Sequence, residues 1–154
     1  MDRQEKWDRR YLGLAQYYAQ FSKDPSTKVG AVLVDYHNRV AGLGYNGFPE
    51  GMDDSDERYL NRELKYKLVV HAEVNAIIDA GIRAAGSTLY VWPSFALPPI
   101  CNECCKVAIT AGVSTIVGFV ADVDSDRAAR WRDSIAIAKM MCDEAGIDYR
   151  GLVE

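Results

Sequence analysis

The sequence has 154 residues, of which 49% are hydrophobic and 26% charged; this composition is typical of a globular protein and excludes a wholly disordered chain. Its 18 basic and 22 acidic residues give a net charge of −4, whereas proteins that hold a long polyanion through its phosphates usually present a basic surface. We therefore expect no nucleic acid among its partners.

The predicted elements alternate in type along the chain. In chain order, the hydrophobic pattern predicts a helix over 7–21, strands over 28–34 and 39–43, a polar glycine-rich segment over 44–56, helices ending near 67 and over 72–80, a strand over 88–92, a helix over 101–111, a strand over 115–120, a helix over 126–145 and a strand over 147–152. A hairpin followed by strand, helix, strand, helix and strand indicates an α/β fold, with a mixed sheet between helices. No repeat or linker is present, so we predict a single domain over residues 1–154.

The sequence contains no run of about 18 apolar residues and no apolar N-terminal signal, which favours a cytoplasmic protein without a membrane partner. Three of its four cysteines are Cys101, Cys104 and Cys105, while Cys142 stands apart. Cysteines this close together make a poor disulfide framework, and in a reducing compartment such a cluster more often binds a metal or acts in redox chemistry. Cys142 is expected in the core, and Cys105 is expected to be a small packing residue rather than a ligand.

Three motifs carry candidate chemistry: HAE at 71–73 and CNEC at 101–104, each opening a predicted helix, and GYNG at 44–47, ending a strand. Alone, each has an ordinary interpretation, since a histidine before a helix usually packs or caps, and a C-x-x-C pair also serves redox and structural zinc sites. Together, His71, Cys101 and Cys104 supply the three ligands of a catalytic zinc site that keeps a position open for water. Glu73 would lie beside that position without binding the metal.

H-x-E followed by C-x-x-C after a strand is the signature of zinc-dependent nucleobase deaminases. The sequence resembles the deoxycytidylate deaminase family in SKDPSTKVGA at 22–31, GYNGFP at 44–49, HAEVNAI at 71–77 and CNEC at 101–104. The motifs stand in the family's order, and the resemblance runs from about Tyr11 to Tyr149. It implies a cytidine-deaminase-like fold, a three-layer αβα arrangement around a five-stranded mixed sheet. It also implies hydrolysis of dCMP to dUMP and ammonia, which supplies dUMP for thymidylate synthesis.

The resemblance implies roles for the residues that match the family's motifs. His71, Cys101 and Cys104 would hold one catalytic zinc per chain. Glu73 would carry protons from the water that zinc activates to N3 of cytosine and to the leaving amine.

Substrate contacts are implied in the same way. The backbone NH of Ala72 would bind the pyrimidine carbonyl, and Asn46 would contact the sugar. Gly44 and Gly47 would let their loop approach the ligand closely. Lys28 is a candidate for a contact with the 5′-phosphate, although a lysine at a strand edge is more often only solvated.

Regulation and assembly are implied by the resemblance alone. The family is often a hexamer switched by dCTP and dTTP, so we expect a homo-oligomer with these two nucleotides as candidate effectors. The acidic run DDSDE at 53–57 is either a solvated helix start or a site for Mg²⁺ with a regulatory nucleotide. No second, structural zinc is predicted, because His37 has no cysteine cluster around it in the sequence.

One segment departs from the family's pattern. Nine residues, Trp92 to Ile100, separate Val91 from Cys101, a longer link than the family usually has. Because this loop leaves a strand end and enters the helix of the zinc site, its first residues are expected to border the pocket. We predict that Trp92 and Phe95 form an aromatic wall near the pyrimidine. The alternative is that Phe95 packs against a neighbouring subunit.

Other functions share some of these features. A deaminase of 5-substituted dCMP has the same motifs, and a riboflavin-pathway pyrimidine deaminase has a similar HAEV segment but usually continues into a reductase domain, whereas this sequence ends at Glu154. A polynucleotide-editing deaminase would flip its base into a similar pocket, which the acidic balance disfavours. A catalytically silent zinc module would have no use for Glu73 beside an open coordination position.

Overall fold

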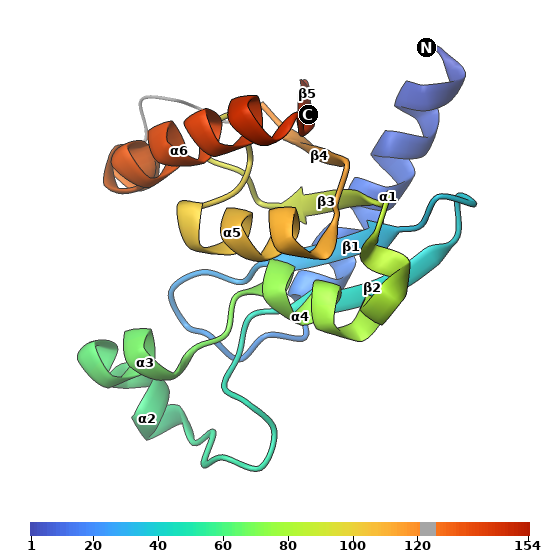
Figure 1. Ribbon diagram of the computed structural model, residues 1–154. Helices are drawn as coiled ribbons and strands as arrows, with labels where there is room; N and C mark the ends of the chain where they lie inside the picture. The colour runs from blue at the N-terminus through green and yellow to red at the C-terminus, as the bar shows by residue number, and fades with distance from the viewer. Residues whose placement is uncertain (121–125) are drawn as a thin grey trace.

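The computed structural model describes residues 1–120 and 126–154, and its centre is a mixed five-stranded sheet (Figure 1). The strands are β1 (Gly30–Val34), β2 (Val40–Tyr45), β3 (Thr88–Trp92), β4 (Thr115–Phe119) and β5 (Asp148–Leu152), in the spatial order β2-β1-β3-β4-β5. β1 pairs antiparallel with β2 and with β3, whereas β3, β4 and β5 run parallel to one another. The predicted mixed sheet is confirmed.

Helices cover both faces of this sheet. On one face lies α1 (Arg3–Ala19), whose Leu12 and Ala15 are buried with Val32 of β1. On the other face lie α4 (Ala72–Ala80), α5 (Asn102–Ala111) and α6 (Asp126–Ala145), whose buried residues join Leu33 of β1 in a second cluster. Neighbouring residues of a strand point to opposite faces of the sheet, so the hydrophobic residues of β1 contribute to the core on both faces. The predicted three-layer αβα arrangement is confirmed.

Three shorter elements complete the fold: α2 (Asp56–Leu60), α3 (Arg62–Leu68) and a 3-10 turn (Gly81–Ala84). The sequence predicts continuous helix up to 67, but Asn61 divides it, because its side-chain oxygen accepts a hydrogen bond from Leu64 N at 3.3 Å and so caps α3. Helix α1 begins at Arg3 rather than at Trp7, since Asp2 caps it through Glu5 N at 2.7 Å. Among the described residues, no helix is long and apolar enough to cross a membrane.

Helix α4 lies unusually close to the sheet, and two glycines of β2 make this possible. A Cβ at Gly42 would lie 2.2 Å from the carbonyl oxygen of Ala76, and a Cβ at Gly44 would lie 2.2 Å from that of Ala72. Only glycine therefore fits beneath this helix. Gly44 serves the packing of α4 rather than the approach of a loop to a ligand, and this packing fixes the helix start that carries His71.

Candidate active site

Two helix starts on the same face of the sheet bring the predicted chemical groups together. His71 is the N-cap residue of α4, with Glu73 in its first turn, and Cys101 is the N-cap residue of α5, with Cys104 in its first turn. One donor atom from each of these four residues lies within 4.8 Å of the other three. The Nδ1 atom of His71 is 3.2 Å from Sγ of Cys104 and 3.6 Å from Sγ of Cys101.

The cluster favours the ionised form of Cys101. Hydrogen bonding from Cys104, and then from His71, lowers the pKa of the Cys101 thiol to about 4, although burial opposes the shift. The hydrogen bond to Cys101 in turn raises the pKa of His71 to about 9, against the effect of burial. The N-termini of α4 and α5 add positive potential on the same side. Negative charge on the Cys101 sulfur is thus stabilised where a cation would be held, whereas the hydrogen bond with Cys101, together with burial, raises the pKa of the Cys104 thiol.

The donor set fits zinc. Two cysteine sulfurs and one imidazole nitrogen are ligands that Zn²⁺ prefers, and three protein ligands match a catalytic site rather than a closed structural one. Cys105, next in the chain to Cys104, is directed into the interior instead, where its Sγ lies 3.6 Å from Sγ of Cys142. Both of these cysteines are fully buried core residues.

Glu73 is the carboxylic acid of the cluster. Its side chain is 6% exposed, and burial raises its pKa, because the ionised form loses its hydration. A buried carboxyl beside a metal site can accept a proton from one bound group and donate it to another. This is the property that acid–base chemistry on a bound substrate requires.

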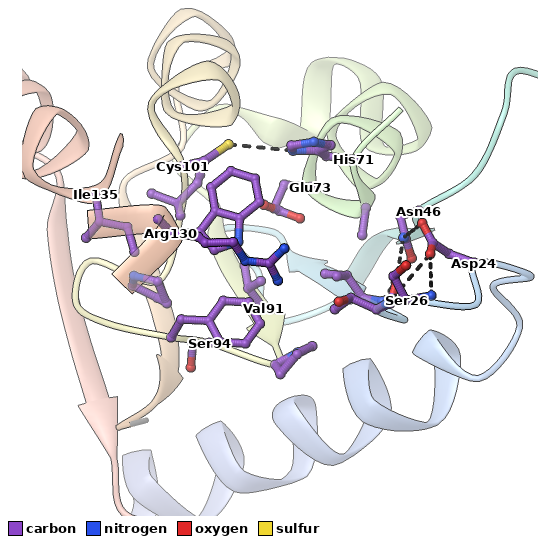
Figure 2. A pocket seen from close by; sticks show the side chains of 18 of the residues that line it. Asp24, Ser26, Asn46, His71, Glu73, Val91, Ser94, Cys101, Arg130 and Ile135 are labelled. Atoms are coloured by element: carbon purple, nitrogen blue, oxygen red, sulfur yellow. Dashed lines mark hydrogen bonds between the residues drawn. The ribbon is translucent and has the colours of Figure 1, made fainter. Parts of the chain in front are cut away.

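A cavity of about 320 Å³ opens from the cluster, a size suited to a small molecule (Figure 2). His71, Glu73 and Cys101 lie at one end, and Asp24, Asn46 and Ser26 lie at the other, as Figure 2 shows. Its walls include Val91, Phe95, Trp131 and Ile135. Much of the cavity wall is therefore apolar, with polar groups at its two ends and on α3 and α6.

The Asn46 end is held rigid by hydrogen bonds. The side-chain oxygen of Asn46 accepts from Val29 N at 2.9 Å, and its amide nitrogen donates to the Thr27 carbonyl at 2.9 Å. The same nitrogen lies 3.4 Å from Asp24 Oδ2. Both amide protons therefore point at the loop that precedes β1, while one lone pair of the oxygen is left for a ligand.

Asp24 and Lys65 form a buried ion pair beneath this loop. Lys65 Nζ lies 3.1 Å from Asp24 Oδ1, and the side chains are 2% and 6% exposed. The same carboxylate oxygen accepts from Ser26 N at 2.8 Å and from Thr27 N at 3.3 Å. Since burying one of these charges alone would be costly, the pair fixes α3 to the loop that lines the cavity.

The structure separates the predicted substrate contacts into two groups. Ala72, Asn46 and Phe95 line the cavity. Trp92 and Lys28 are not among its lining residues: Trp92 packs on the α1 side of the sheet, and the Lys28 ammonium donates a hydrogen bond to the carbonyl of Ser22.

The start of α6 contributes residues to the cavity that no sequence motif predicts. Trp131 packs edge-on against His71, with ring centroids 6.4 Å apart and an interplanar angle of 83°. Arg130, beside it, also lines the cavity, as does the buried Lys65. The spacing of apolar residues predicts that 126–145 is helical. It does not predict that the N-terminal part of this helix packs against His71.

Comparisons with known proteins agree with this geometry. Residues 5–120 match the family model of the cytidine and deoxycytidylate deaminase zinc-binding region. The deoxycytidylate deaminases of Pongo abelii and Homo sapiens are 36% and 35% identical over 154 residues, which cover 96% of this chain and 80% of each relative. An uncharacterized deaminase encoded in the luxG 3′ region of Aliivibrio fischeri is 34% identical over 96% of this chain and 94% of its own length.

A solved structure shows the same fold. The dCMP deaminase of cyanophage S-TIM5, crystallised with dCMP and dUMP, has a TM-score of 0.69 to this chain, with 23% sequence identity over 99% of each chain.

Proposed function

The chain belongs to the cytidine and deoxycytidylate deaminase family, and from this membership we propose that it hydrolyses dCMP to dUMP and ammonia, supplying dUMP for thymidylate synthesis. The observation that carries the proposal is the cluster of His71, Glu73, Cys101 and Cys104 at the inner end of the cavity. Relatives that bear the name deoxycytidylate deaminase support the choice of substrate.

In this proposal His71, Cys101 and Cys104 hold zinc. The ion, when bound, supplies a Lewis acid that makes water nucleophilic near neutral pH. The protein's own contribution is to fix these donors at two helix starts packed on the sheet, so that the metal position is set by backbone rather than by flexible loops.

Glu73 moves the protons. The reaction adds water at C4 of cytosine, breaks the bond to the exocyclic nitrogen and releases ammonia. Glu73 accepts a proton from the water and donates it to N3, and it then transfers the second proton to the leaving amine. Burial raises the pKa of Glu73, which favours its protonated form, the form that donates to the substrate.

The cavity orients the nucleotide between its two ends. With C4 at the cluster, the base lies between the walls formed by Phe95 and Trp131. The Ala72 NH is proposed to bind the pyrimidine carbonyl, and the remaining lone pair of the Asn46 side-chain oxygen is proposed to accept a hydrogen bond from the sugar. The hydrogen bonds around Asn46 support this role, since they leave its side chain no freedom to turn away.

Regulation by dCTP and dTTP, a hexameric assembly and a cytoplasmic location complete the proposal and rest on the family resemblance. The acidic run at 53–57 is a less favourable Mg²⁺ site than its composition indicates. Asp54 pairs with Lys23 at 2.9 Å, and Asp53 lies 3.7 Å from Arg58. Two of its carboxylates are therefore already neutralised by basic side chains.

A substrate panel tests the proposal. Ammonia release is measured from zinc-loaded protein with cytosine, deoxycytidine, dCMP, 5-methyl-dCMP, dCTP and a cytosine-containing single-stranded oligonucleotide, with and without dCTP or dTTP as effector. We expect the highest kcat/KM with dCMP. A higher value for 5-methyl-dCMP would identify a deaminase of 5-substituted nucleotides, and a comparable value for the oligonucleotide would refute the assignment to free nucleotides.

A further inference from the structure

Among the described residues that line the cavity, one cation takes part in no ion pair. Outside the His71–Glu73–Cys101 end, the charged residues among the described lining residues are Asp24, Lys65 and Arg130. Asp24 and Lys65 neutralise each other in their buried pair. Figure 2 shows the Arg130 side chain extending across the cavity, between Glu73 and the Ser26 end. Among the described residues of its lining, the cavity therefore presents one positive charge outside any ion pair, on a side chain that reaches into it.

More positive charge gathers around Tyr66, another residue of the cavity wall. Arg62 donates a hydrogen bond to the Tyr66 hydroxyl at 3.0 Å, and Lys65 Nζ lies 4.9 Å from the ring centroid. The Arg62 hydrogen bond lowers the pKa of Tyr66, and the charges of Arg62, Lys65 and Arg130 lower it further. Arg62 and Arg130, for which no ion pair is found among the described residues, thus add positive potential at this part of the cavity wall, which attracts anions.

The cavity's geometry determines which part of a ligand would meet these charges. Trp131, next to Arg130 on α6, packs against His71 and so marks the base end, where C4 must lie for reaction. Successive helical residues point about 100° apart, which lets one turn of α6 contact two different parts of a ligand. In Figure 2 the guanidinium of Arg130 extends from α6 toward the side of the cavity where Ser26 lies, away from Cys101.

Resting on the deaminase function proposed above, we propose that Arg130 is a specificity-determining residue that binds the 5′-phosphate of the nucleotide. Guanidinium groups bind phosphate oxygens through paired hydrogen bonds in a fixed planar geometry. The pairing of Asp24 with Lys65 assists, since it keeps a bare carboxylate from repelling the phosphate. Lys28, the phosphate contact expected from sequence, is engaged with the Ser22 carbonyl instead.

The test compares two arginines of the same helix. Arg130→Gln removes the charge and keeps a polar, though shorter, side chain, and Arg132→Gln is the matched control, because Arg132 lies outside the cavity lining. The readout is the ratio of kcat/KM for dCMP to kcat/KM for deoxycytidine. We expect Arg130→Gln to lower this ratio about 10- to 100-fold, the effect of losing hydrogen bonds to a charged group. Arg130→Lys should restore part of it, and Arg132→Gln should leave it unchanged.

An unchanged ratio, whether kcat/KM stays the same or falls equally for both substrates, would overturn the role of Arg130. A second measurement separates this outcome from failure of the proposed function. Binding of dUMP and of deoxyuridine is measured by titration calorimetry with the wild type and Arg130→Gln. If the wild type deaminates neither substrate, the deaminase proposal fails. The phosphate role would still be supported if Arg130→Gln weakened dUMP binding at least about tenfold and left deoxyuridine binding unchanged.

Discussion

The buried ion pair between Lys65 and Asp24 allows a quantitative prediction. Lys65→Met keeps most of the side-chain volume but leaves Asp24, 6% exposed, without its counter-charge. Removing one partner of a buried pair costs about 3–5 kcal/mol. The two backbone NH groups that also bind Asp24 Oδ1 offset part of the loss, so we expect a value near the lower limit, about 3 kcal/mol. In a chain of this size that lowers Tm by about 6–12 °C.

Urea and thermal unfolding of purified variants measure this effect. The control is Lys67→Met on the same helix, whose side chain is 71% exposed and lies 3.9 Å from Glu63, so its loss should change the unfolding free energy by less than about 0.5 kcal/mol. The double variant Lys65→Met with Asp24→Asn should recover about half of the loss or more, because no charge is then left buried alone. A loss below about 1 kcal/mol for Lys65→Met, or no recovery in the double variant, would refute the reasoning.

The remaining predictions concern the metal cluster and pH. Glu73→Gln should retain zinc, measured by atomic absorption, while kcat falls about 10²- to 10⁴-fold, since Gln cannot transfer protons; loss of zinc together with activity would show that Glu73 is a ligand. Cys104→Ala should abolish zinc binding and Cys105→Ala should leave it intact, because the Cys105 sulfur is directed into the core; equal zinc content in the two variants would contradict this assignment. Burial raises the pKa of Asp8, but hydrogen bonds led by that from Arg150 outweigh it and hold the pKa below its usual value. This stabilisation is present above the unfolded pKa of about 3.9 and is lost as pH falls through the pKa of the folded protein. The wild type should therefore be more stable than Asp8→Asn in urea unfolding, and the difference should shrink below about pH 4. A difference that stays constant with pH would exclude a stabilising role for the Asp8 charge.

Short-range sequence patterns predicted the features of the fold that depend on interactions between neighbouring residues. Helix α4 begins and ends as the sequence indicates, at Ala72 and before Gly81, because its apolar periodicity and its terminal glycine act within a few residues. The H-x-E and C-x-x-C spacings placed the candidate donors at helix starts, where the structure has them. The metal cluster could therefore be predicted from the sequence, on the assumption that the N-termini of these two helices lie side by side.

The contacts that shape the rest of the cavity depend on tertiary structure. Strand β3 is apolar on both faces, so its sequence does not say that Val91 faces the cavity while Trp92 faces α1. Lys65 reads as one more lysine of a polar helix, and its partner Asp24 lies 41 residues away. Trp131 reaches His71 only because α6 packs beside α5. These placements require the packed structure, since no short-range pattern encodes them.

The most direct test of the account is the stoichiometry of the reaction with dCMP. Zinc-loaded protein is incubated with dCMP, and dUMP is quantified by chromatography while ammonia is measured in a coupled assay. The account predicts one ammonia for each dUMP formed, with turnover abolished when zinc is chelated and restored when zinc is returned. Zinc-loaded protein that binds dCMP but releases neither product would contradict it.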